Sequence, residues 1–418
     1  MHRTGLIEHN IKKELRRSDF YFSPALKDPN ILADSILEAA HILANPAVLA
    51  ARISYTKSSG KPVARAGDHP STIALRMLNR GISEESNALG NRDAIVVGLK
   101  TILSEQVPFS VIKLDVKSFY ESFTSETINQ HLADSRSLSS STRIAIKEVL
   151  GNHVTLGYTG LPRGLVVSPT LADSMMRQFD EKISSDERIF FYRRFVDDIV
   201  IITTTGINCP HLIEEIEGHL PGGLKFKPSK NATLSFDKCL PKENASGKQT
   251  KYLTFNYLGY SFNSANSDHN YRPDATRDVW LDIAPNKVSR TKTRIMKSYV
   301  DFIRNNDFAL LEKRLRHLTS NISIRDRSKG ITRLSGIHFN YPLVDLERTR
   351  SLRELDQFLR TTLNSTKGRI FSKLSTQLTK LQRSHLLRNS FYSGAKLKRF
   401  YQFNSKELGR IQRCWKHE

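Results

Sequence analysis

The chain has 418 residues, of which 39% are hydrophobic and 25% are charged, so it is long enough to bury a sizeable core in two or three subdomains. It contains no apolar run of about 18 residues, which argues against a membrane span, and its polar start argues against a secretion signal. Its three cysteines are far apart and form neither a zinc-site pattern nor a disulfide framework, so we expect a reducing, cytoplasmic location.

The net charge of +22 is concentrated in the C-terminal part of the chain. Residues 264–418 contain 32 Lys and Arg against 14 Asp and Glu, whereas residues 1–263 contain 32 against 28. A basic block of this size favours a polyanionic partner, and it favours nucleic acid over an acidic membrane surface. A solvated basic surface without a partner is the simpler alternative.

The first 110 residues are predicted to be mainly helical, with one interruption. Within residues 1–50, the stretch NILADSILEAAHIL repeats apolar residues at three- and four-residue spacing, as a helix with one buried face does. Residues 51–72 are polar, basic and rich in Gly, Pro and Ser, which predicts a hairpin or a mobile loop. Residues 73–106 return to a helical pattern.

The middle of the chain alternates between strand and helix patterns. Residues 109–116, FSVIKLDV, predict an apolar strand that ends in a charge, and a Ser-Pro pair opens a predicted helix over 165–183, with Pro169 at a first helical position. This order predicts an α+β fold in which helices cover one face of an antiparallel sheet. The other predicted elements are a helix over 124–150, a hairpin over 190–202, a helix over 209–220, a strand within 224–236 and a strand or hairpin over 252–262.

From about residue 285 the pattern is almost entirely helical, with basic faces. A loop rich in Gly and aromatic residues is predicted to interrupt it at 328–342. The tail then interleaves cations with aromatic side chains, which either stack on unpaired bases or form a helix core, and the sequence favours neither alternative. The aromatic residues of the tail are Tyr392, Phe400, Tyr401, Phe403 and Trp415.

Residues 190–202 read FFYRRFVDDIVII and place two aspartates between two apolar, β-branched runs. Adjacent ionised carboxylates repel each other, and burial adds to the free-energy cost, so the pair needs either solvent or a compensating cation. A solvated turn is the common setting for such a pair. The alternative is a divalent ion such as Mg²⁺, which prefers oxygen ligands and binds through one or two carboxylates together with substrate phosphates.

Asp115 is a candidate for the further carboxylate that such a site needs. It lies at the end of an apolar strand, about 80 residues before the Asp-Asp pair. A strand-end aspartate beside a hairpin-tip pair would hold two divalent ions, which activate an attacking 3′ hydroxyl and stabilise a leaving pyrophosphate. Phosphoryl transfer of this kind needs little beyond positioning and charge neutralisation.

Five motifs resemble, in order, those of bacterial reverse transcriptases related to group II intron and retron enzymes. LDVKSFYESF (114–123) is similar to the first palm motif, GLPRGLVVSP (160–169) to the G-L-P-Q-G…S-P motif, and RRFVDDIVI (193–201) to the R-Y-A-D-D motif. GLKFKPSKNATL (223–234) matches the segment that ends in a lysine, and YLGYSF (257–262) matches the primer-grip hairpin. Together with the fingers, the resemblance covers roughly residues 50–265.

The resemblance implies an α+β, right-hand polymerase with fingers, palm and thumb. Its domains would be an N-terminal helical extension over 1–50, fingers over 51–110, a palm of antiparallel sheet and helices over 111–262, and a basic helical thumb and C-terminal region over 263–418. It also implies an RNA-directed DNA polymerase that adds dNTPs to a 3′ hydroxyl with two Mg²⁺ ions, Mn²⁺ being an alternative.

The catalytic residues that the resemblance implies are three aspartates and a lysine. Asp115 and Asp197 would be the main metal ligands, and Asp198 would assist them. Lys230 would lie near the leaving pyrophosphate as a cation or a general acid.

The resemblance also implies a nucleotide site. Tyr120 lies five residues after Asp115, where the family places a bulky residue under the sugar 2′ position, so its ring would exclude ribonucleotides. The alternative is that Phe119 and Tyr120 are both core aromatics. Lys61 and Arg65 lie in the basic stretch of the fingers and would clamp the triphosphate, unless they are simply solvated.

Template and primer contacts are implied for small residues of the palm and for the primer grip. Gly160 and Gly164 would let the backbone approach template and incoming nucleotide closely. Ser168 and Pro169 would begin the helix beneath the nascent base pair. Leu258 and Gly259 would form the tip of the primer-grip hairpin, beside the primer.

Two residues depart from the family's pattern. Arg163 replaces a Gln that normally braces the incoming nucleotide and the template, so it would hold phosphate or bias which nucleotide is accepted. Phe195 replaces a Tyr. Its ring can still pack, but the hydroxyl contact that the Tyr makes to the primer is lost. Neither change removes a metal ligand, and activity should therefore survive.

The implied thumb would follow the phosphate backbone of a template–primer duplex through Lys287, Arg290 and Arg294. These cations, together with Lys292 and Lys297, fall on or beside one helical face of residues 287–318. A solvated basic face is again the simpler alternative.

We find no ribonuclease H signature, no zinc-ligand cluster of an HNH endonuclease and no retron-specific motif pair. The chain therefore most resembles compact bacterial reverse transcriptases of antiphage defence, which use a dedicated noncoding RNA as template. Partners would be that RNA, the DNA product, dNTPs, and a second reverse transcriptase, another defence protein or a second copy of the chain. The alternatives are a retron or group II intron-type reverse transcriptase, an RNA-directed RNA polymerase, and an RNA-binding scaffold or splicing helper with a vestigial palm.

Overall fold

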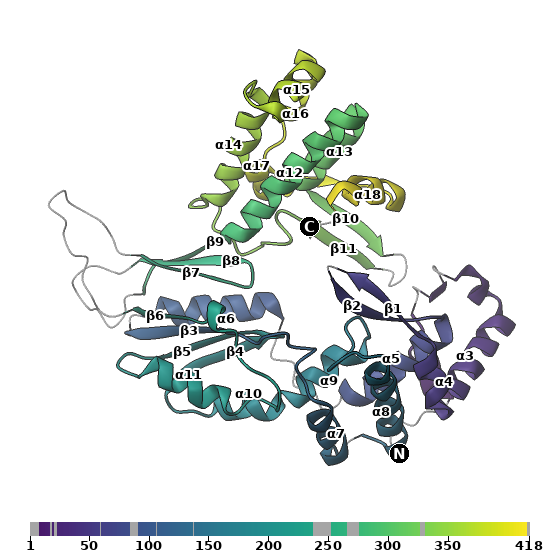
Figure 1. The fold of residues 1–418 in the computed structure, drawn as a ribbon. Coiled ribbons are helices and arrows are strands. Elements are labelled where there is room, and N and C mark those ends of the chain that lie inside the picture. The colour runs from purple at the N-terminus through teal and green to yellow at the C-terminus, as the bar shows by residue number, and fades with distance from the viewer. Residues whose placement is uncertain are drawn as a thin grey trace. The chain divides into compact units, whose positions relative to one another are not determined.

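The computed structural model describes residues 8–16, 19–20, 23–58, 60–83, 91–105, 107–136, 138–236, 252–265, 276–326 and 331–415. The chain forms two compact units (Figure 1). Unit 1 comprises residues 1–95 and 107–238, and unit 2 comprises residues 96–106 and 239–418. Over the described part of the chain, no helix has the length and apolar character needed to cross a membrane.

Unit 1 begins with helices that surround a hairpin of two strands. The hairpin pairs Ile53 with Ala66 and Ser58 with Lys61, so the expected fingers segment is a hairpin rather than a loop. Its buried side contributes Ala64 to a core shared with the neighbouring helices. The elements are α1 (Glu8–Lys12), η1 (Pro24–Lys27), α3 (Pro29–Ala44), α4 (Pro46–Ala51), β1 (Ile53–Ser58), β2 (Lys61–Ala66), α5 (His69–Ser83) and α6 (Arg92–Ser104), the last of which continues into unit 2.

The rest of unit 1 is built on a four-stranded antiparallel sheet with the strand order β4-β5-β3-β6. The central strands carry β-branched residues such as Val111, Ile112 and Ile201, which are fully buried, while α10 and α11 lie on the same side of the sheet (Figure 1). The elements are β3 (Phe109–Asp115), α7 (Ser125–Asp134), α8 (Ser140–Thr155), α9 (Val167–Met175), α10 (Arg177–Ser184), β4 (Ile189–Phe195), β5 (Asp198–Thr204), α11 (Cys209–Glu217), η2 (Pro228–Lys230) and β6 (Ala232–Phe236).

Two helices that the sequence predicts as continuous are divided. The segment 124–150 forms α7 and α8, because Ser139 caps a new helix by accepting a hydrogen bond from the backbone N–H of Thr142. The segment 165–183 forms α9 and α10, which separate at Met176. Helix α9 begins at Val167, so Pro169 is the third helical residue rather than the first, and its missing N–H still costs no helical hydrogen bond.

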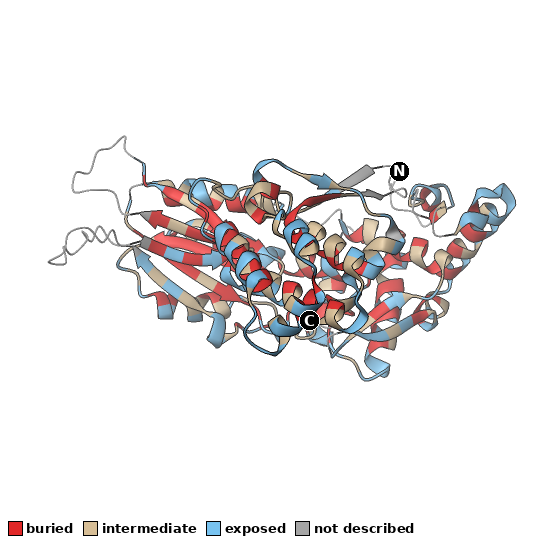
Figure 2. Cartoon of the chain, turned by 90° about the horizontal axis from the view of Figure 1, so that it is seen from above, coloured by how far each residue is buried: buried red, intermediate tan, exposed pale blue. Residues whose placement is uncertain are grey.

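Unit 2 combines a three-stranded antiparallel sheet, β7-β8-β9, with a helical part. Helices α12, α13 and α14 enclose a core that includes Tyr299, Phe302 and Leu355, and Figure 2 shows how the helices bury one face and expose the other. The elements are β7 (Tyr252–Tyr257), β8 (Tyr260–Ala265), β9 (Val279–Ile283), α12 (Pro285–Asn305), α13 (Phe308–Thr319), β10 (Asn321–Asp326), β11 (Ile331–Gly336), α14 (Ser351–Asn364), α15 (Arg369–Gln377), α16 (Lys380–Leu387), α17 (Phe391–Lys396), β12 (Phe400–Tyr401), α18 (Ser405–Gln412) and η3 (Arg413–Trp415).

The structure of unit 2 differs from the sequence prediction in two places. Residues 321–326 and 331–336 form the antiparallel strand pair β10–β11, where a helix end and a loop are predicted; β12 joins this pair in parallel to β10. The hairpin β7–β8 pairs with β9, not with the four-stranded sheet, so residues 252–262 belong to unit 2 although the predicted palm extends to residue 262.

Candidate active site

The structure brings Asp115 and the Asp-Asp pair together at one edge of the four-stranded sheet. Strands β3 and β5 are antiparallel neighbours, and Asp115 lies directly opposite Asp198 in their register. Just beyond the strand end, the backbone N–H of Val116 donates a hydrogen bond of 3.0 Å to the carbonyl of Asp197. The strand end and the hairpin tip are thus fixed to each other by backbone hydrogen bonds, which the sequence spacing alone does not reveal.

The turn that carries Asp197 has an unfavourable backbone conformation. Phe195 pairs with Asp198, which leaves Val196 and Asp197 as the two turn residues. Val196 has a φ of 59°, in the left-handed region that a β-branched residue rarely adopts. Such a conformation persists only where the surrounding contacts enforce it, and it is common at functional sites.

Arg194, to which the sequence analysis assigned no role, supplies one of those contacts. Its guanidinium donates to the Val196 carbonyl at 3.1 Å and to Asp173 at 3.0 Å, and it forms a bidentate pair with Asp180 at 2.8 and 2.6 Å. The Tyr192 hydroxyl also donates to Asp180. Although burial disfavours the charge of Arg194, its hydrogen bonds to Asp180 raise its pKa, so the guanidinium stays charged. This network ties the turn to α9 and α10.

The carboxylates repel one another, and two lysines offset part of that repulsion. Burial raises the pKa of the Asp198 carboxyl, and the charges of Asp197 and Asp115 raise it further. Lys230 forms an ion pair with Asp115, and this hydrogen bond raises the pKa of the lysine. Lys113, which sequence reasoning missed, lies two residues before Asp115 on the same face of β3, and burial lowers its pKa.

The chemistry of this group suits a hard divalent cation. Carboxylate oxygens are the ligands that Mg²⁺ and Mn²⁺ prefer, and a cation would relieve the repulsion that raises the pKa of Asp198. Within the described ranges, however, no three acidic, His or Cys side chains converge tightly enough to form a metal cage by themselves. The carboxylates would therefore need further oxygen atoms from a substrate, as is common for Mg²⁺.

The two aromatic residues after Asp115 have different environments. Phe119 is 2% exposed and belongs to the core, where it packs edge-on against Tyr120 with ring centroids 5.3 Å apart. Tyr120 is only half-buried. Burial raises the pKa of its hydroxyl, and Asp173 and Asp197 add to that effect, so the ring lies within electrostatic range of the carboxylates. Phe119 is therefore the core residue of the pair, whereas the place of Tyr120 beneath the sugar of an incoming nucleotide stays a prediction.

Arg163 is held by a neighbour that the sequence analysis did not single out. Its guanidinium forms a bidentate pair with Glu121 at 2.5 and 2.9 Å. Lys61 of β2 approaches the same carboxylate at 3.3 Å. Arg65 is exposed on the same face of β2 as Lys61. The backbone of β2 also reaches this loop, because the N–H of Ala64 donates to the Arg163 carbonyl at 2.7 Å.

Gly160 and Gly164 are required because a side chain at either position would clash with the backbone of the protein itself. A Cβ at Gly160 would lie 2.1 Å from the Tyr120 carbonyl oxygen, and one at Gly164 would lie 2.5 Å from the Ala64 carbonyl oxygen. Both residues have a positive φ. Ser168, fully buried, donates to the Pro162 carbonyl at 2.6 Å and so fixes the loop to the start of α9. Contacts with nucleic acid at Gly160, Gly164 and Ser168, and at Pro169, stay a prediction.

We expect Gly160→Ala to lower the free energy of unfolding by about 1–3 kcal/mol more than Gly157→Ala. Both glycines have φ near 80°, so a Cβ costs about 1–2 kcal/mol of backbone strain at either position. Only at Gly160 would the Cβ also overlap backbone atoms, because no atom lies within 4 Å of a Cβ at Gly157. Urea unfolding of the two variants measures the difference, and equal losses would contradict the packing.

The remaining predicted residues lie in unit 2. Leu258 and Gly259 form the β7–β8 turn with φ of 46° and 82°, and the Gly259 carbonyl accepts a hydrogen bond from the backbone of Ala284 at 3.0 Å. On α12, Lys287 is half-buried and Arg290 is exposed. Arg294 stacks over the Trp415 ring at 5.6 Å.

Other parts of the basic helix and the aromatic tail serve packing. Lys292 turns away from the face of Lys287 and pairs with Glu354 at 2.6 Å. Trp415 is buried, and its indole N–H donates to the Arg294 carbonyl at 3.1 Å, so it is a core residue. Phe400, by contrast, is 43% exposed. Trp415 thus matches the interpretation of the tail as a helix core, whereas stacking of the exposed Phe400 on unpaired bases stays a prediction.

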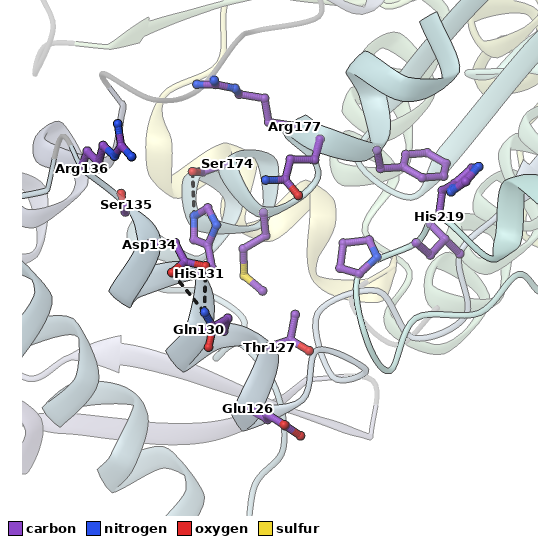
Figure 3. Close-up of a pocket in the computed structure, with 15 residues that line it drawn as sticks. Glu126, Thr127, Gln130, His131, Asp134, Ser135, Arg136, Ser174, Arg177 and His219 are labelled. Atoms are coloured by element: carbon purple, nitrogen blue, oxygen red, sulfur yellow. Dashed lines mark hydrogen bonds between the residues drawn. The ribbon is translucent and has the colours of Figure 1, made fainter. Parts of the chain in front are cut away.

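A hollow of about 840 Å³ lies elsewhere in unit 1, between α7, the α9–α10 junction and the end of α11 (Figure 3). Its lining combines Met175, Phe179 and Leu220 with polar side chains that largely bond to one another, such as His131 with Ser174 at 2.9 Å. None of the predicted site residues lines this hollow.

The fold is of the α+β class, and its palm-like antiparallel sheet brings three aspartates to the place where a strand end meets a hairpin tip. Residues 72–262 match the family described as reverse transcriptase (RNA-dependent DNA polymerase). The chain thus carries a reverse transcriptase domain, the domain of RNA-directed DNA polymerases, which are nucleotidyltransferases. Domains of this kind generally use divalent metal ions.

Solved structures similar to the chain include telomerases of two Candida species. Apo telomerase from Candida tropicalis truncated from the C-terminal domain is 12% identical over 51% of this chain and 53% of that chain, with a TM-score of 0.32. Telomerase from Candida albicans in complex with a TWJ fragment of telomeric RNA is 11% identical over 87% and 61%, with a TM-score of 0.31. Apo telomerase from Candida tropicalis is 15% identical over 82% and 55%, with a TM-score of 0.30.

The chain therefore spans between 53% and 61% of the length of these structures. The comparison with curated protein sequences gives no match.

Proposed function

We propose that the chain is an RNA-directed DNA polymerase that extends a 3′ hydroxyl with dNTPs on an RNA template. The observation that carries the proposal is the register of the sheet, in which Asp115 lies opposite Asp198 beside the strained turn of Asp197. The reverse transcriptase domain over residues 72–262 supports the same reaction.

Asp115, Asp197 and Asp198 would hold two Mg²⁺ ions, with Mn²⁺ as an alternative. Bound divalent ions supply charge neutralisation for the triphosphate and a lower pKa for the attacking hydroxyl. Lys230, paired with Asp115 in the protein alone, would be released to stabilise the leaving pyrophosphate once the charge of that carboxylate is neutralised. The half-exposed ring of Tyr120 would exclude a 2′ hydroxyl.

Primer extension tests the proposal directly. The full chain is mixed with an RNA template, an annealed DNA primer, dNTPs and Mg²⁺ or Mn²⁺, and products are resolved by length. We expect extension to the template end and its loss on chelation by EDTA. A matched DNA template measures template preference, and no extension on RNA with either ion would contradict the proposal.

Tyr120→Ala should relax sugar selection. Removing the ring opens space beneath the sugar, so we expect the preference for dNTP over NTP, measured as the ratio of kcat/KM values, to fall by roughly 10- to 100-fold. Phe391→Leu is the control, because Phe391 is buried in the core of unit 2 and should affect stability and not selection. A wild type that already prefers NTPs would contradict the role of Tyr120 and favour an RNA-directed RNA polymerase.

We further propose that the template is a cognate noncoding RNA and that the chain acts in bacterial antiviral defence, in the cytoplasm, alone or with a partner protein. The strongly basic residues 264–418 support RNA binding. Sequencing the nucleic acid that co-purifies with the chain, together with cDNA made in cells, tests this. An intron or a retron RNA in the preparation would favour those classes instead.

A further inference from the structure

We propose that Glu121 is a positioning residue that controls nucleotide selection by holding the Arg163 guanidinium against the ring of Tyr120. This inference rests on the proposed function, because it concerns the same nucleotide site. It assigns Arg163 to the support of the sugar-selecting ring, whereas the sequence predicts that Arg163 holds phosphate or biases which nucleotide is accepted.

The geometry fixes the guanidinium in both position and orientation. Each carboxylate oxygen of Glu121 accepts one hydrogen bond from Arg163, at 2.5 and 2.9 Å. A bidentate pair of this kind sets the plane of the guanidinium as well as its place. The central carbon of that group then lies 5.3 Å from the centroid of the Tyr120 ring, within the range of a cation–π contact.

The Tyr120 ring has a second support from the core. Phe119 meets it edge-on with ring centroids 5.3 Å apart, and Phe119 is itself buried. Phe119 therefore cannot move without disturbing the core, whereas the Arg163 guanidinium is held in place by its bonds to Glu121. Loss of the Glu121 carboxylate would therefore release the Arg163 guanidinium and leave Phe119 in place.

The charges of this cluster are coupled to the catalytic carboxylates. Burial opposes ionisation of Glu121, but the hydrogen bonds from Arg163 lower its pKa below the ordinary value, and the same bonds raise the pKa of Arg163. The pair is therefore ionised at neutral pH. The charge of Asp197 acts on both Arg163 and Tyr120, so the cluster lies within electrostatic range of a proposed metal ligand.

A phosphate role suits Lys61 better than Arg163. Two of the N–H groups of Arg163 are already bonded to Glu121, so a phosphate contact through them would break a partly buried ion pair. Lys61 makes a single, longer contact of 3.3 Å with the same carboxylate and is half-exposed. The geometry thus separates a stationary cation, Arg163, from a movable one, Lys61.

The test compares dNTP and NTP incorporation, as the ratio of kcat/KM values, in wild type, Glu121→Gln, Arg163→Lys and the double variant. We expect each single change to lower the ratio by about 3- to 30-fold, the effect expected from loss of an oriented cation–π contact. Arg163→Lys keeps the charge but loses the bidentate geometry. In the double variant, Glu121→Gln should add less than about twofold, because Glu121 acts only through Arg163.

Glu181→Gln is the matched control, since it breaks an exposed pair with Arg177 at 3.0 Å and should leave the ratio unchanged. Two results would overturn the inference: an unchanged ratio in Glu121→Gln, or a fall of the ratio on Glu121→Gln that is as large in the Arg163→Lys background as in wild type. Extension by the wild type would still uphold the proposed function. Absence of wild-type extension would overturn both. If Glu121→Gln does not fold, Arg163→Lys decides alone: an unchanged ratio overturns the inference.

Discussion

Asp197→Asn should abolish primer extension, with a loss of at least about 1000-fold in rate, while the protein stays folded. Asparagine has nearly the same shape but lacks the charge that would offset a divalent ion and the triphosphate, a contribution of several kcal/mol. The backbone carbonyl that accepts the Val116 N–H at 3.0 Å is unaffected, so the hairpin should keep its place. Single-turnover extension with saturating Mg²⁺ measures the loss.

The same substitution should stabilise the metal-free protein at neutral pH. In the folded state the pKa of Asp198 is raised by burial and then by the charges of Asp197 and Asp115. A carboxyl with a raised folded pKa stabilises the fold below its unfolded pKa, and this contribution is lost as the pH rises through the folded pKa. Removing the charge of Asp197 lessens that loss, so the melting temperature in EDTA should be higher at pH 7 than that of wild type.

Asp134→Asn serves as the control for both measurements, because Asp134 is exposed on α7 and only accepts hydrogen bonds from Gln130. It should change neither extension nor the melting temperature in EDTA by much. Extension by Asp197→Asn at a rate close to that of wild type would contradict the assignment of Asp197 as a metal ligand. A lower melting temperature of the variant in EDTA would contradict the mutual repulsion of the carboxylates.

The backbone of the candidate site was predictable because local pattern determines it. An apolar, β-branched run that ends in a charge predicts a strand with its last residue at a sheet edge, and this is where Asp115 lies. Two such runs around Val196 and Asp197 predict a hairpin. Ordered motifs then indicated that strand and hairpin belong to one palm, and the register of β3 and β5 agrees with that expectation.

Side-chain partners far apart in the sequence were not predictable in the same way. Glu121 and Arg163 are 42 residues apart, and nothing in either motif indicates that they form a bidentate pair. A buried arginine such as Arg194 looks like any surface cation until helices place its acceptors beside it. The strand pair β10–β11 was missed because its strands are short and polar, and their pairing with β12 is set by tertiary contacts.

Arg194→Met should destabilise the protein by about 3–5 kcal/mol, since it leaves the buried Asp180 carboxylate, which also accepts a hydrogen bond from the Tyr192 hydroxyl, without its cationic partner. For a unit of this size we expect the melting temperature to fall by roughly 10 °C. The variant also loses the hydrogen bond to the Val196 carbonyl, which helps to hold the strained turn. Extension measured well below the melting temperature should therefore fall as well.

The chain offers a matched control in Arg188, which lies exposed in the turn before β4 and has two carboxylate partners, Asp186 and Glu215, both at 2.7 Å. Water screens such pairs, so Arg188→Met should change the melting temperature little. Adding Asp180→Asn to Arg194→Met should recover part of the lost stability, because no uncompensated charge is then buried. Differential scanning calorimetry of the three variants measures these effects. Equal losses for Arg188→Met and Arg194→Met would show that the buried network does not hold the hairpin against α9 and α10.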